Sequence, residues 1–126
     1  MAKLKLGNRP KNFKRVVKFD MLDGSKCEIE AVFKYRTRSE FGAFIDGLFK
    51  QAKDKDEGAQ NISMAELMEK TRETNADYLL DILDGWDLDT ELSRDALQQL
   101  SDEVPGAVGA MMEAYRAAII DGRVGN

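Results

Sequence analysis

The sequence predicts a mainly helical α+β fold, with an N-terminal β-hairpin followed by about four α-helices in one small domain. Three observations predict this fold class. The length of 126 residues suits a single domain. Residues 13–35 alternate apolar and polar side chains with a period of two, which is typical of strands. From residue 37 onward, apolar side chains recur at helical spacing behind capping signals.

The hairpin is expected over residues 13–35, with its turn at Asp23-Gly24. A two-residue turn would set Phe19 opposite Glu28 and mix apolar with charged faces. A three-residue loop over 22–24, with Gly24 left-handed, instead sets Phe19 opposite Cys27. This register also pairs Val17 with Ile29, Asp20 with Lys26 and Lys18 with Glu28. Cys27 is therefore expected to be a buried small apolar side chain rather than a reactive thiol.

Helix starts are marked by four local signals. Residues 37–40 and residues 63–66 are both capping boxes, in which a hydroxyl and a carboxylate satisfy the first free amides. Ser93 begins a short third helix, and Pro105 suits the first turn of the last. These signals place the helical part of the domain over residues 37–126.

Helix ends are expected at glycines. The first helix ends near Gly58, the second at Gly85 and the last at Gly122. Trp86 then lies in a link between the second and third helices, where it is expected to pack as an anchor rather than to bind a partner.

The composition argues against most catalytic and metal chemistry. The chain has no histidine, the usual general base and imidazole ligand, and its single cysteine forms neither an internal disulfide nor a thiolate zinc site. The acidic run over residues 84–91 resembles a calcium loop only superficially, because its glycine comes too early. We therefore expect no enzyme activity, no cofactor and no metal site.

The same composition indicates a soluble protein of a reducing cytoplasm. No apolar run approaches the roughly 20 residues of a membrane-spanning helix. The N-terminus is basic but has no apolar segment of the kind found in secretory signals.

Charge is unevenly distributed along the chain. Residues 1–18 hold seven lysines and arginines and no acidic residue, so residues 19–126 carry −11 against −4 for the whole chain. Residues 1–12 are expected to form a basic flexible arm in front of a single domain over 13–126. Clustered basic residues attract phosphate, but only one aromatic lies in the segment, so nucleic-acid contact is the less favoured interpretation.

Four methionines are the candidate partner-binding residues. Met64 and Met68 lie on the expected second helix, and Met111 and Met112 on the last. Methionine is ordinary core filler, and it also forms adaptable surfaces that accept varied apolar partners. The spacing leaves both interpretations open.

The last third of the chain has a characteristic order of motifs. The motifs are Gly85-Trp86-Asp87, Leu92-Ser93, Ala96-Leu97-Gln98-Gln99-Leu100, Val104-Pro105-Gly106-Ala107, Ala114-Tyr115, Ala118 and Gly122-Arg123-Val124-Gly125-Asn126. This order resembles the tail assembly chaperones of long-tailed phages and prophages, most clearly over residues 79–126.

The resemblance implies a non-enzymatic factor of the host cytoplasm that is absent from the finished virion. Such proteins bind the tape measure protein, keep it soluble and help to recruit tail tube subunits, and they are often oligomeric. A small nucleic-acid-binding regulator that uses the basic arm is the alternative. Binding to phosphates weakens steeply with added salt, whereas apolar binding does not, so salt dependence separates the two.

Overall fold

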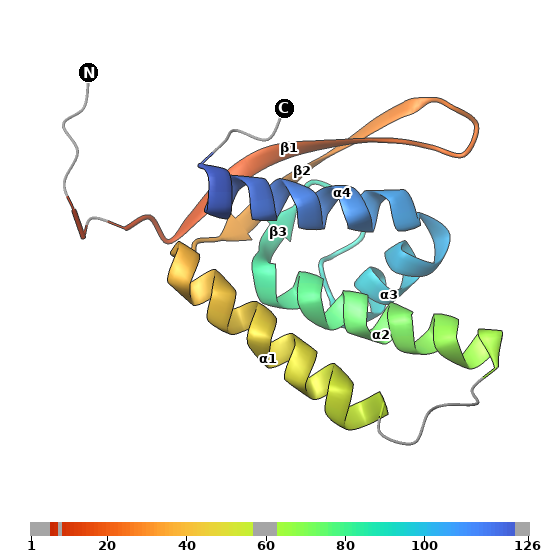
Figure 1. Ribbon diagram of the computed structural model, residues 1–126. Helices are drawn as coiled ribbons and strands as arrows, with labels where there is room; N and C mark the ends of the chain where they lie inside the picture. Colours follow the sequence, from red (N-terminus) through yellow and green to blue (C-terminus); the bar gives the residue numbers. More distant parts are fainter. Residues whose placement is uncertain (1–5, 8, 57–62, 123–126) are drawn as a thin grey trace.

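The computed structural model describes residues 6–7, 9–56 and 63–122. Its described part holds a three-stranded antiparallel sheet in the order β1-β2-β3, four α-helices and a closing π-helical turn, η1. The elements are β1 (Asn12–Asp20), β2 (Lys26–Lys34), α1 (Arg38–Asp56), α2 (Met64–Ile82), β3 (Leu83–Trp86), α3 (Arg94–Glu103), α4 (Pro105–Arg116) and η1 (Ala117–Asp121). Figure 1 shows α4 running along the hairpin, with α1 and α2 on the other side of α4. The predicted α+β class, with a hairpin followed by helices, is confirmed.

The hairpin has the predicted register. Phe19 lies opposite Cys27 and Val17 opposite Ile29. The charged pairs Asp20–Lys26 and Lys18–Glu28 also face each other as expected. Gly24 adopts φ +87°, which is the left-handed conformation that the three-residue loop requires.

Cys27 is exposed, so the prediction that it is buried was wrong. The reason lies in where α4 begins. Its first turn meets the end of β1, where a Cβ on Gly106 would lie 3.6 Å from the carbonyl oxygen of Asp20. The hairpin turn extends past this end of α4, as Figure 1 shows. Correct pairing with Phe19 therefore does not bring Cys27 under a helix.

The segment after α2 is a strand, which was not expected from the sequence. Leu83 leaves the helix in an extended conformation, with φ −105° and ψ 134°. Residues 83–86 then pair with β2, so that Trp86 lies opposite Ala31 and Gly85 opposite Val32. The predictions that Gly85 caps α2 and that Trp86 lies in a link were therefore wrong. Trp86 is half-buried against the core, and its Nε1 donates to the carbonyl oxygen of Thr90 at 2.7 Å.

The predicted helix starts are confirmed. In the first capping box, the Thr37 amide donates to Glu40 Oε1 at 2.9 Å and the Glu40 amide to Thr37 Oγ1 at 3.2 Å. Ser63 and Ser93 accept the expected amide bonds at the starts of α2 and α3, and Pro105 begins α4.

The ends of the helices agree with the prediction in part. Gly122, with φ +66°, closes the last turn as predicted. α1 is described to Asp56, and the end expected for it near Gly58 lies outside the described residues.

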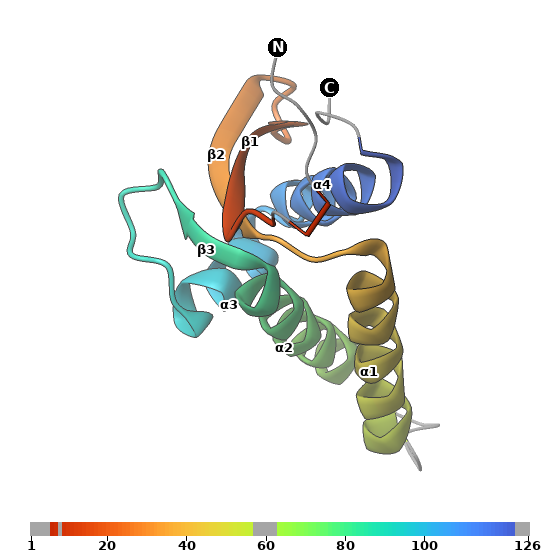
Figure 2. The same cartoon turned by 90° about the vertical axis from the view of Figure 1, so that its left-hand side faces the viewer.

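The core lies between one face of the sheet and the helices α2, α3 and α4. Its largest fully buried side chains are Tyr115, Phe33, Ile29, Leu79, Ile82, Leu97 and Met111. The Tyr115 ring centroid lies 5.3 Å from that of Phe33 and 5.7 Å from that of Phe41. Phe41 belongs to the first turn of α1, which otherwise lies at one edge of the molecule (Figure 2).

Candidate functional site

The four candidate methionines do not share one surface. Met111 is 0% exposed and belongs to the core, where it faces inward from α4. Met112 is partly buried beside it. Met64 is 69% exposed and Met68 is 53% exposed, both at the start of α2. Of the two interpretations left open by the sequence, Met111 therefore fits the core, whereas Met64 and Met68 are accessible.

The apolar face of α2 is covered by the core in the second half of the helix and is uncovered in its first turns. Ala76, Leu79 and Ile82 are fully buried on this face. Met68 precedes Ala76 by two helical steps of four residues, and such steps keep side chains on one side of a helix. The first two turns of α2 therefore present the core-facing side of the helix to solvent.

A groove of about 270 Å³ lies beside Met68, between the start of α2 and the end of α3. Its lining residues are Ala65, Met68, Glu69, Arg72 and Asp102. Two of these, Glu69 and Asp102, are acidic. Arg72 Nη2 lies 3.7 Å from Glu69 Oε1, while Arg72 Nε is buried and finds no hydrogen-bond partner among the described residues. We name Met64 together with these five lining residues the α2 end surface.

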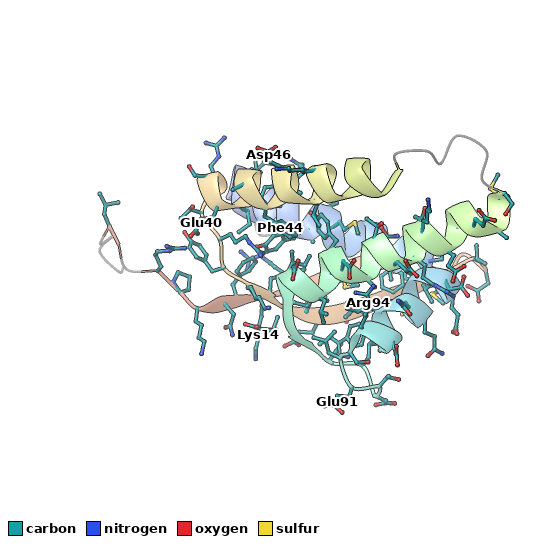
Figure 3. All side chains as sticks on the ribbon, turned by 90° about the horizontal axis from the view of Figure 1, so that it is seen from below. Lys14, Glu40, Phe44, Asp46, Glu91 and Arg94 are labelled. Atoms are coloured by element: carbon teal, nitrogen blue, oxygen red, sulfur yellow. The ribbon has the colours of Figure 1, made fainter. Side chains whose placement is uncertain are left out.

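Polar contacts between α2 and α3 fix the position of this surface. Asn75 Nδ2 donates to Ser101 Oγ at 3.2 Å. Arg94, at the start of α3, forms an ion pair with Asp77, and Figure 3 shows Arg94 beside α2. These contacts hold the middle of α2 against α3. The position of the preceding turns, which carry Met64 and Met68, is therefore fixed relative to α3.

A second cluster of polar contacts joins α1, α2 and α4 to the sheet. Arg36 Nη1 donates to Tyr115 Oη at 3.0 Å and to the carbonyl oxygen of Asp81 at 3.1 Å, and its guanidinium lies 4.2 Å from the centroid of the Phe44 ring. In Figure 3, Phe44 points from α1 toward the body of the molecule and Asp46 points away from it. Burial raises the pKa of Tyr115 and of Tyr78. The contacts of Arg36 with Tyr115, Asp81 and Phe44 connect α4, α2 and α1.

Several basic side chains near the N-terminus have acidic partners. Arg9 forms an ion pair with Glu40, Lys26 Nζ lies 2.6 Å from Asp20 Oδ1, and Lys14 Nζ lies 3.9 Å from Glu30 Oε1. Residues 1–5 and 8 of the expected basic arm lie outside the described residues. Within the described part, these pairs reduce the positive charge left for a polyanion.

Metal sites and membrane-spanning helices are both absent from the described part of the chain. Among residues 6–7, 9–56 and 63–122, no group of three or more cysteine, aspartate or glutamate side chains is placed to hold a metal ion. None of the helices in the same ranges has the length and apolar character to cross a membrane.

These features define a small α+β protein whose sheet begins with an N-terminal hairpin and whose helix α2 has accessible apolar side chains at its start. A family model described as phage tail assembly chaperone matches residues 1–126, which is the whole chain. The chain therefore belongs to this family of phage tail assembly chaperones, and the resemblance noted in its last third is confirmed. No curated protein and no solved structure matches the chain.

Proposed function

We propose that the protein binds the tape measure protein of its phage, keeps it soluble and helps to recruit tail tube subunits around it. In this proposal it acts in the host cytoplasm, without enzymatic activity, and does not enter the finished virion. Membership of the tail assembly chaperone family supports the role in assembly. The choice of partners rests on the resemblance and on the surface described above.

The observation that carries the proposal is the uncovered face of α2 at Met64 and Met68. A tape measure protein is long and helical, and helices with uncovered apolar faces aggregate. Methionine side chains adapt to different apolar shapes, which suits a surface that contacts many segments of one long partner. An amphipathic helix laid on the α2 end surface would bury its apolar residues against these two methionines.

The charge distribution supports a solubilising role. Residues 19–126 carry a formal charge of −11, and like charge on many bound copies keeps complexes apart. The alternative of a nucleic-acid-binding regulator finds less support, since Arg9 and Lys14 of the basic segment already face carboxylates.

Co-expression tests the proposal. The longest helix-rich protein encoded downstream in the same genome is produced with and without this chain, and its soluble fraction is measured. We expect the chain to raise the soluble fraction and to co-purify with its partner. The double variant Met64→Asp, Met68→Asp should remove both effects while it keeps the helical circular dichroism of the wild type.

The matched control is Leu22→Asp. Leu22 is fully exposed at the hairpin turn, so this variant makes the same apolar-to-acidic change far along the chain from α2. It should solubilise the partner as well as the wild type does. Equal loss in the control and in the double variant would contradict the assignment to α2, and no solubilisation by the wild type would contradict the proposed function.

A further inference from the structure

Arg15 occupies an inward-facing position of β1. Arg15 lies between Phe13 and Val17 on the face of β1 that α4 covers, because side chains two residues apart in a strand share a face. Its cross-strand neighbour is the fully buried Ala31. Its guanidinium carbon lies 5.0 Å from the centroid of the Phe13 ring, and its Nη1 donates to the carbonyl oxygen of Lys14 at 2.8 Å. Arg15 is partly buried there, and a charge taken out of water is costly unless it is paired or hydrogen-bonded.

Arg15 has no anionic partner within the described part of the chain, where its contacts are the Phe13 ring and the carbonyl oxygen of Lys14. Its Nε is buried without a hydrogen-bond acceptor. Arg9 provides a direct comparison. The guanidinium carbon of Arg9 lies 5.3 Å from the centroid of the Tyr35 ring, but Arg9 also forms an ion pair with Glu40. Two guanidinium groups thus cover neighbouring aromatic rings, and one of them lacks an anionic partner.

A pocket of about 180 Å³ opens beside Arg15. Its other walls are Pro10, Phe13, Tyr35, Ala118 and Ile119, the last two from η1. An apolar cavity of about 150 Å³ accommodates a ring the size of benzene, so this pocket accommodates one apolar side chain. It shares no lining residue with the α2 end surface.

We propose that this pocket binds a segment of a partner protein that carries a carboxylate next to an apolar side chain. Because Nη1 is engaged with Lys14 and Nε is buried, Nη2 is the donor of Arg15 that remains to bind a carboxylate, in a charge-assisted hydrogen bond. The apolar walls receive the neighbouring side chain. A nucleic acid fits less well, since Arg15 already covers the outer face of Phe13 and a polyanion needs several cations. The site goes beyond the proposed function, because it adds a second, charge-selective contact.

Side-chain NMR tests this site without knowledge of the partner. The ¹⁵N-labelled full chain is titrated with N-acetyl-leucyl-glutamyl-amide, and separately with the neutral N-acetyl-leucyl-glutaminyl-amide. The acidic peptide should shift the Arg15 Nε–H resonance together with the Ala118 and Ile119 amides. It should bind about tenfold more tightly than the neutral one, as a charge-assisted bond implies. Shifts that are equal for both peptides, or absent at these residues, would overturn the proposal.

Two variants test whether the charge of Arg15 produces this preference. Arg15→Gln removes the charge, and we expect it to lose the preference for the acidic peptide. Lys14→Gln, which removes a charge at the next position on the outer face, should keep that preference. An unchanged preference in Arg15→Gln would overturn the proposal. Tighter binding of a thymidine oligonucleotide through the same resonances would instead assign the site to nucleic acid and overturn the proposal.

Discussion

The hydroxyl of Tyr115 donates a hydrogen bond to the backbone carbonyl oxygen of Lys34 at 2.9 Å, across 81 residues of sequence. This bond ties α4 to the end of β2. The same hydroxyl accepts from Arg36 Nη1, which also holds the carbonyl oxygen of Asp81 at the end of α2. The Tyr115 ring is fully buried. Its hydroxyl connects the sheet with α4, and Arg36, which precedes α1, connects this pair to α2.

Removal of this hydroxyl should destabilise the protein. In Tyr115→Phe the carbonyl of Lys34 loses its side-chain donor and Arg36 loses an acceptor, so we expect a loss of about 1–3 kcal/mol in the free energy of unfolding. Urea denaturation followed by circular dichroism measures it. Tyr78→Phe is the matched control, because no hydrogen bond of the Tyr78 hydroxyl is found in the described part of the chain. Equal losses in the two variants would contradict the role given to the Tyr115 hydroxyl.

Two glycine-to-alanine substitutions should change the free energy of unfolding in opposite directions. Gly24 adopts φ +87° in the hairpin turn, so Gly24→Ala should cost about 1–2 kcal/mol. Gly109 lies within α4 with no atom within 4 Å of an added Cβ, so Gly109→Ala should stabilise by about 0.5–1 kcal/mol. Thermal melts of both variants test this, and stabilisation by Gly24→Ala would contradict the left-handed turn.

An aspartate should prevent folding at the buried Met111 but not at the exposed Met68. Met111→Asp places a charge at a fully buried position and should cost more than about 4 kcal/mol, which leaves the chain unfolded. Met68→Asp changes a half-exposed side chain and should alter the free energy of unfolding by no more than about 0.5 kcal/mol. Circular dichroism and one-dimensional NMR measure both. A folded Met111→Asp variant would contradict the burial of Met111.

The first capping box should make stability depend on pH in acid. The Thr37 amide, and then Arg9, hold the pKa of Glu40 below its ordinary value of 4.5. A lowered native pKa gives stability that is present above the unfolded value and is lost as the pH falls through the native value. Glu40→Gln should therefore be less stable than the wild type at neutral pH, with the difference vanishing in strong acid. Asp46→Asn, an equal charge change elsewhere on α1, is the control. A difference that is the same at all pH values would contradict the role of the charge.

Local patterns were sufficient to predict the hairpin and the helix starts. The register follows from matching the apolar side of β1 with that of β2 around a left-handed glycine, and both sides are read directly from the sequence. Capping residues act within one turn, so the starts at Thr37, Ser63 and Ser93 could also be predicted. None of these features depends on distant parts of the chain.

Features that depend on distant contacts could not be predicted in the same way. Residues 83–86 contain a glycine after a helix, which is typical of a cap, and only pairing with β2 makes them a strand. Cys27 has an apolar partner position but lies past the end of α4. The exposure of Met68 and the burial of Met111 depend on how far neighbouring helices extend. Arg15 did leave a signal in the sequence, since it interrupts the apolar side of β1, but its missing partner is a property of the folded chain.

Hydrogen exchange of the co-purified complex shows directly where the tape measure protein binds. In the proposed function, it is bound by the uncovered first turns of α2. Amides over residues 63–72 should therefore exchange more slowly in the complex than in the free protein, while amides over residues 20–26 at the hairpin turn should not change. Protection confined to the hairpin, or unchanged exchange over 63–72 in a stable complex, would contradict it.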